Sequence, residues 1–179
     1  MKIGTIRDLI AYRRRHDHMV ERRAETTFHS QWGGDWKAIS FYNRATQSEQ
    51  LVLQKGHVVS DEPTLVRMHQ LSLLDDVYGA VGARNGLLAK SMQIIAEEGA
   101  GLIVVLTSNS PGDFLSRILR HHAGQPGSGM DELRDYGVGA QILADLGVHD
   151  MILLSNSHHS LIALDGYDLA VVGQRSVEL

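Results

Sequence analysis

Residues Leu87 to Leu106 read LLAKSMQIIAEEGAGLIVVL, in which a helical pattern leads straight into a strand pattern. The apolar residues of the first part recur with helical spacing, at Leu88, Met92 and Ile95, and Gly99 is expected to end the helix. The continuous apolar run from Leu102 to Leu106 is typical of a strand buried on both faces. A helix followed by such a strand indicates a layered α/β domain.

The same alternation of helix and strand continues towards the C-terminus. Helices are expected at Asp113–His122 and at Tyr136–Leu146, the second ending at Gly147. The stretch GQPGSG, residues 124–129, is expected to form a flexible loop between them. Two further buried strands are predicted, at Met151–Leu154 and Leu169–Val172.

Towards the N-terminus the pattern has a period of two, from Val20 to Val59. Strands are expected at Trp36–Tyr42 and Gln50–Leu53, joined by the polar turn NRATQSE, and another at Thr64–His69. Antiparallel strands followed by helix–strand alternation predict a layered α/β domain with a mixed β-sheet.

Composition limits the class of protein. With 179 residues, 43% of them hydrophobic and 21% charged, the chain suits one globular domain. No apolar run approaches the roughly 20 residues of a membrane span, and a net charge of -4 gives no reason to expect nucleic acid as a partner. The chain has no cysteine, so disulfides are excluded and a cytoplasmic location is the default expectation.

Six segments carry a family resemblance in one collinear order. They are LVRMH (65–69), DDVYG (75–79), IAEEGAG (95–101), LRDYGVGAQILADLGV (133–148), LLSN (153–156) and ALDGYDLAVV (163–172). Together they resemble GTP cyclohydrolase II, the zinc enzyme that opens the guanine ring of GTP at the start of riboflavin synthesis. The resemblance runs from about Val20 to the C-terminus and implies the family's fold and a homodimer.

The first residues carry a second resemblance. The segment KIGTIRDLIAYR, residues 2–13, resembles the end of a 3,4-dihydroxy-2-butanone 4-phosphate synthase domain, which precedes the cyclohydrolase in bifunctional riboflavin proteins. We therefore expect residues 1–19 to be a helix and linker, and residues 20–179 to be the cyclohydrolase-like domain. The resemblance implies a synthase domain as a fused or associated partner.

The residues that would bind zinc are missing. The family uses three cysteines, one soon after the Arg-x-His strand and two close together before the next helix. Here the first position falls on Ser72, and the later pair falls within GARNG, residues 82–86, which is one residue shorter than usual. Serine, alanine and asparagine are poor zinc ligands beside a thiolate. We expect no zinc cofactor and no catalytic residues of the family type.

The phosphate-binding and catalytic loop is also altered. The family's Arg-Gln-Glu-Gly-Arg-x-Ile-Gly-Leu loop corresponds to TSNSPGDFL, residues 107–115, in which both arginines and the glutamate are absent. The tyrosine of the preceding strand is replaced by Val105. The phosphate-binding lysine that follows the last motif is missing from Ser155–His159. Losing an arginine removes a bidentate phosphate clamp that a neutral side chain does not replace.

Other positions still match the family and could form a weakened site for GTP or a related nucleotide. They are Arg67, His69, Asp76, Arg134, Asp135, Tyr136, Ser155 and Asn156. The structural alternative is that Arg134 and Asp135 cap a helix while Arg67 pairs locally. A substitute metal site from His69 with the pair His121–His122 or His158–His159 is disfavoured, because adjacent side chains point apart.

The favoured hypothesis is therefore a cyclohydrolase II-like domain that has lost its chemistry and keeps a structural, dimerising or regulatory role for a fused synthase. One alternative is a nucleotide or flavin sensor that uses the remnant pocket. The other is an active hydrolase with an altered metal or substrate.

Overall fold

A seven-stranded mixed sheet forms the centre of the computed structural model, which describes residues 19–59, 61–107, 112–125, 129–156 and 168–178. The strand order is β1-β2-β3-β5-β4-β6-β7. The strands are β1 (Val20–Ser30), β2 (Gly34–Asn43), β3 (Ser48–Lys55), β4 (Thr64–Gln70), β5 (Gly101–Leu106), β6 (Asp150–Leu154) and β7 (Ala170–Arg175). The helices are the short π-helix η1 (Leu73–Val77), α2 (Leu87–Glu98), α3 (Phe114–His122) and α4 (Gly129–Asp145).

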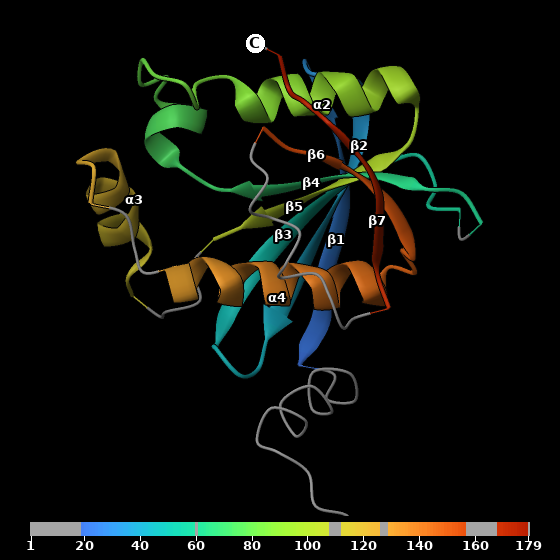
Figure 1. Ribbon diagram of the computed structural model, residues 1–179, viewed down its shortest axis with the longest axis horizontal. Helices are drawn as coiled ribbons and strands as arrows, with labels where there is room; N and C mark the ends of the chain where they lie inside the picture. The colour runs from blue at the N-terminus through green and yellow to red at the C-terminus, as the bar shows by residue number, and fades with distance from the viewer. Residues whose placement is uncertain (1–18, 60, 108–111, 126–128, 157–167, 179) are drawn as a thin grey trace, which may run out of the picture.

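The sheet is antiparallel on one side and parallel on the other. Strands β1, β2, β3 and β5 pair antiparallel, whereas β5, β4, β6 and β7 pair parallel. Helix α2 covers one face and α4 the other, while α3 lies at one end of the molecule (Figure 1). The predicted layered α/β domain with a mixed sheet is confirmed.

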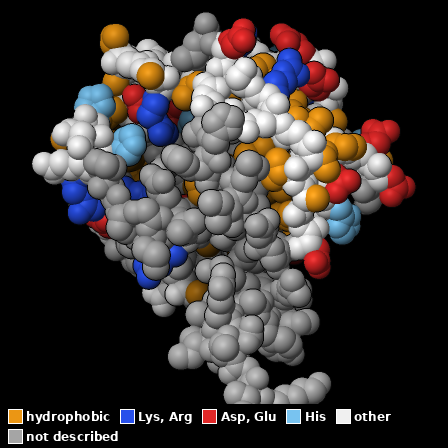
Figure 2. Space-filling model, viewed as in Figure 1, with side chains coloured by type: hydrophobic (Ala, Val, Ile, Leu, Met, Phe, Trp, Pro, Cys, Tyr) orange, Lys and Arg blue, Asp and Glu red, His pale blue; other side chains and the backbone are white. Residues whose placement is uncertain are grey.

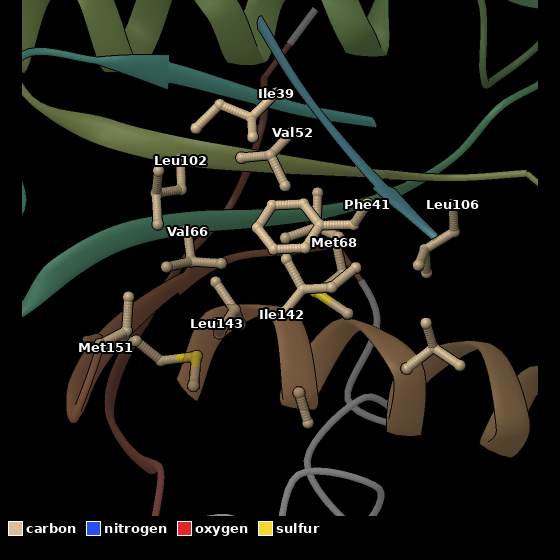
Figure 3. Packing of buried hydrophobic residues seen from close by; sticks show 14 of the residues in the cluster. Ile39, Phe41, Val52, Val66, Met68, Leu102, Leu106, Ile142, Leu143 and Met151 are labelled. Carbon is tan, nitrogen blue, oxygen red and sulfur yellow. The ribbon is translucent and has the colours of Figure 1, made fainter. Parts of the chain in front are cut away.

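Strand β5 shows why the sheet is buried on both faces. Its side chains alternate between two apolar clusters, and all six of its residues are buried. Leu102, Val104 and Leu106 belong to the cluster on the α4 side, where Ile142 and Leu143 point towards the sheet (Figure 3). Ile103 and Val105 pack in the cluster on the α2 side. The uninterrupted apolar run is thus explained by helices on both faces.

We predict that Gly101→Ala lowers the free energy of unfolding by about 2–3 kcal/mol, as overpacking does in a well-packed core. Gly101 has a φ of +155°, and a Cβ there would lie 2.7 Å from the Leu65 carbonyl oxygen. It would also lie 2.9 Å from Ile95 Cγ2. Urea denaturation measures the loss.

Gly99→Ala is the matched control for this prediction. Gly99 ends α2 with a φ of +84°, but a Cβ there meets nothing within 4 Å. Alanine at Gly99 therefore carries only the backbone cost of the left-handed conformation, about 1 kcal/mol. Equal losses for the two variants would contradict the steric argument at Gly101.

Most predicted elements are present, with three corrections. Helix α2 has the expected bounds, but α4 begins at Gly129 rather than at Tyr136, so the expected loop is shorter. Strand β7 begins at Ala170 and ends at Arg175, and it is an edge strand with mostly exposed side chains rather than a buried one. Strand β1 and η1 were not separately predicted.

The division into residues 1–19 and 20–179 stays a prediction, because residues 1–18 lie outside the described part of the chain. Among the described residues, no helix has the length and apolar character needed to cross a membrane.

Candidate functional site

Two of the matching residues, His69 and Asp76, lie at the carboxyl end of β4 and in η1, close to where α3 and the end of β5 line a cavity. In α/β sheets, ligands commonly bind beyond the carboxyl ends of parallel strands. A cavity here has a volume of about 20 Å³ and is lined by Gln70, Leu71, Ser72, Arg84, Thr107, Phe114, Arg117, Ile118 and His121. Basic and histidine side chains gather over this end of the molecule, on the left of Figure 2. The space holds about one water molecule, since a water needs some 10–15 Å³.

A buried histidine–aspartate pair lies next to the cavity, in contact with the lining residue Ser72. His69 Nε2 lies 2.9 Å from Asp76 Oδ2, and the two side chains are 1% and 2% exposed. The same Asp76 oxygen accepts a hydrogen bond of 2.9 Å from the Ser72 backbone N–H. These two contacts of Asp76 hold the end of β4 against η1. His69 and Asp76, both predicted to belong to one site, therefore lie side by side.

Ser72, at the first cysteine position, is occupied by local structure. Its hydroxyl accepts a hydrogen bond of 3.3 Å from the Asp75 backbone N–H, as the N-cap of η1. In the segment GARNG, the Arg84 side chain turns back and donates to the Gln70 carbonyl at 2.8 Å. Its Nε lies 3.6 Å from Asp75 Oδ2. Ser72, where the family resemblance implies a zinc cysteine, thus caps η1, and Arg84 within GARNG contacts the end of β4.

Arg67 lies inside the fold beside this network. Its Nη1 donates to the Leu154 carbonyl at 2.8 Å, which links β4 to the end of β6. Burial lowers the pKa of the Arg67 guanidinium, and the Arg84 charge acts in the same direction, whereas Tyr136 and Asp76 oppose it. Arg67 thus has a partner within the fold, as the structural alternative expects, although its acceptor is 87 residues away in the sequence.

Arg117, from α3, occupies the side of the cavity that faces α4. Its guanidinium donates to the Asp135 carboxylate in a short ion pair, with side chains 16% and 5% exposed. With its amide oxygen turned towards Arg117, Gln70 also accepts from Arg117 Nε at 2.9 Å. Arg134 and Asp135 lie within α4 rather than at its start, so the hypothesis that they cap the helix is wrong.

Ser155 and Asn156 are held by the C-terminal segment. The Ser155 backbone N–H donates to the Arg175 carbonyl at 3.0 Å. The Asn156 amide donates to the Val177 carbonyl at 2.9 Å and accepts from the Val177 N–H at 2.7 Å. Of the eight predicted nucleotide-binding residues, Arg67, His69, Asp76 and Tyr136 come together, while Asp135, Ser155 and Asn156 contact other parts of the fold. The structure places Arg134 on the exposed side of α4.

The described residues do not fit the zinc that the family resemblance implies. No three His, Cys, Asp or Glu side chains in the described ranges are grouped so that they could hold a metal ion. His69 already contacts Asp76, and His121 lines the small cavity. His158 and His159 lie outside the described residues. A hydroxyl engaged in capping at Ser72 offers neither the charge nor the softness of a thiolate.

Comparison with known proteins decides the family. The family model for GTP cyclohydrolase II matches residues 21–176. The chain belongs to the GTP cyclohydrolase II family. It is 37% identical to the riboflavin biosynthesis protein RibBA of Bacillus cytotoxicus and 38% identical to that of Bacillus cereus. Each match covers 100% of this chain and 48% of the relative, so the chain spans about half the length of these proteins.

A solved structure resembles the whole chain. It is the crystal structure of RibBX, a two domain 3,4-dihydroxy-2-butanone 4-phosphate synthase from A. baumannii. The TM-score is 0.58 at 27% identity, and the match covers 100% of this chain and 46% of that one. The cyclohydrolase II-like fold of the chain is thus shared with part of a protein that is described by a synthase activity.

The sequence analysis missed several residues of this cyclohydrolase II-like site. Gln70, Arg84 and Arg117 were not selected, although together they surround the cavity. Thr107 was noted only for the arginine it replaces, yet its N–H donates to the buried Gln50 side chain at 2.7 Å. Arg84 could have been selected from the sequence, because it is the one charged residue of the shortened GARNG loop.

Proposed function

We propose that this chain is a cyclohydrolase II-like domain of a riboflavin-synthesis protein that has given up GTP ring opening and supports a fused 3,4-dihydroxy-2-butanone 4-phosphate synthase. The support is structural, dimerising or regulatory. One observation carries the proposal: the Ser72 hydroxyl, at a zinc-thiolate position, is used to cap η1.

The chemistry of the site supports the loss of hydrolysis. Residues that do not hold zinc provide no Lewis acid to lower the pKa of an attacking water towards about 7. The cavity of about 20 Å³ is far below the roughly 300 Å³ of an ordinary ligand pocket. No observation at this site favours the alternative of a nucleotide or flavin sensor.

The comparisons support the fused partner. The RibBA relatives are about twice the length of this chain, since the chain covers 48% of them. RibBX is described as a two domain synthase, and this chain corresponds to 46% of it. A domain of this family can therefore be part of a protein that is described by the synthase activity alone.

We expect the purified 179-residue chain to contain substoichiometric zinc and to release no formate from GTP above the uncatalysed background. Metal analysis by mass spectrometry and a formate assay measure the two quantities. An active family member assayed in parallel controls for both. Stoichiometric zinc together with formate release would contradict the proposal and favour an active hydrolase.

The supporting role has its own experiment. In the natural fusion, deleting the cyclohydrolase II-like domain is expected to change synthase turnover or the oligomeric state. If the truncated synthase keeps both unchanged, the supporting role fails even when the chain is inert towards GTP.

A further inference from the structure

A larger cavity lies at the other end of β4. Its volume is about 300 Å³, against about 20 Å³ for the cavity beside α3. Leu65, near the start of β4, lines the larger cavity, whereas Gln70, at the end of that strand, lines the smaller one. The larger cavity is therefore separate from the site that the family resemblance predicts. Its size is at the lower end of the range for sites that bind small organic molecules, about 300–1,000 Å³.

The lining of the larger cavity combines apolar and charged side chains. Apolar surface comes from Val59, Leu65 and Ile152, and charged groups come from Glu62, Glu98 and Arg175. Leu65 is buried and Ile152 is half-buried, whereas the two glutamate side chains are exposed. Apolar walls with a few polar groups are the usual composition of a small-molecule site.

The charged groups of this lining leave one carboxylate without a counter-charge. Arg175 Nη1 donates to Glu98 Oε1 at 2.6 Å, so these two charges already match each other. The Glu62 carboxylate forms no ion pair with another residue of the described part of the chain, and its backbone N–H donates to the Val59 carbonyl in the turn before β4. The cavity therefore offers one free negative charge beside apolar surface.

Helix α2 makes the same end of the cavity more favourable for a cation. It ends at Glu98, and its last turn contains no basic residue. The C-terminus of a helix carries a partial negative charge, which stabilises cations near it. Acidic side chains surround apolar ones on the right of Figure 2, the side on which α2 ends in Figure 1.

We propose that the larger cavity binds a small organic amine, whose protonated nitrogen pairs with Glu62 and whose apolar body lies against Leu65 and Ile152. A phosphorylated or carboxylated ligand is disfavoured, because its charge would meet Glu62 while the guanidinium of Arg175 is already paired. The proposal is independent of the proposed function, since it concerns the opposite end of β4.

Isothermal titration calorimetry of the 179-residue chain with tryptamine tests the proposal. Tryptamine joins an apolar ring system to a primary amine, which is protonated at neutral pH as the amine of lysine is. We expect a Kd of about 1 mM or lower. Glu62→Gln keeps the shape of the side chain and removes its charge, so it is expected to raise this Kd about ten-fold.

Asp61→Asn is the matched control, because Asp61 is the exposed neighbour of Glu62 and does not line the cavity. It removes the same charge and is expected to change the Kd by less than about two-fold. Thermal unfolding checks the fold of both variants, which should hold because both side chains are exposed. Equal rises in Kd for the two variants would mean that tryptamine responds to net charge alone, and would overturn the proposal.

Two further ligands separate the parts of the recognition. Indoleacetate keeps the ring system but carries a carboxylate, and butylamine carries the ammonium group on a chain like that of a lysine side chain. Each is expected to bind at least about ten-fold more weakly than tryptamine, because one lacks the positive charge and the other lacks most of the apolar body. Absence of tryptamine binding, or equally tight binding of either of these ligands, would overturn the proposal.

Discussion

Asp76→Ala is expected to lower the free energy of unfolding by about 3–5 kcal/mol, because it removes two buried hydrogen bonds to a carboxylate, each worth roughly 1.5–3 kcal/mol. The substitution removes the carboxylate that contacts His69 Nε2 and leaves the Ser72 N–H without its acceptor. The His69 and Asp76 side chains are 1% and 2% exposed, so water does not replace the contact between them. Urea denaturation at neutral pH measures the change through the transition midpoint.

Asp75→Ala separates this effect from a general loss of acidic charge in η1. Asp75 lies next in sequence but pairs with Arg84 only at 3.6 Å. We expect about 1 kcal/mol of destabilisation from it. Asp76→Asn should recover part of the loss, since its amide oxygen can still accept from Ser72. If the two alanine variants cost the same, the pair with His69 does not hold η1 in place.

Three of the positions that match the family resemblance make structural contacts in this chain. His69 and Asp76 join β4 to η1, and Arg67 joins β4 to the end of β6. These contacts give each of the three residues a role in the fold that is independent of any ligand.

Local sequence patterns were sufficient to predict the helices and strands that form the core. Helix α2 and strand β5 were predicted because their apolar spacing reports directly on the faces they bury. Strand β1 falls within the period-two stretch from Val20 to Val59 but was given no bounds of its own, because both of its faces are exposed. The start of α4 was missed because Gly129 closes a glycine-rich stretch that reads as a loop.

The site was harder to predict than the fold, because its contacts are distant in sequence. The absence of cysteine could be read directly, and it gave the expectation that zinc is lost. The contacts of Arg67 and Arg117 could not be predicted from the sequence. Arg67 bonds to a carbonyl 87 residues away, and Arg117 pairs with a carboxylate 18 residues away. Spacing along a single element does not report on pairs of this kind.

Arg117→Met is expected to cost about 2–3 kcal/mol of stability, because it keeps the apolar length of the side chain and removes the charge that pairs with Asp135. The same Arg117 guanidinium faces Gln70, so the variant also loosens the contact between α3 and the end of β4. A double-mutant cycle with Asp135→Asn should return a coupling of about 2 kcal/mol. Chemical denaturation of the four proteins in the cycle supplies the values.

Arg120→Met, three residues further along the same helix, supplies the control. Arg120 also pairs with a carboxylate, that of Asp113 at 2.7 Å, but both of these side chains are largely exposed. Exposed pairs contribute little, so its loss should stay below about 0.5 kcal/mol. A coupling near zero for Arg117 and Asp135 would mean that this pair does not hold α3 against α4. Asp135 would then again be a candidate for ligand binding rather than a residue kept for the fold.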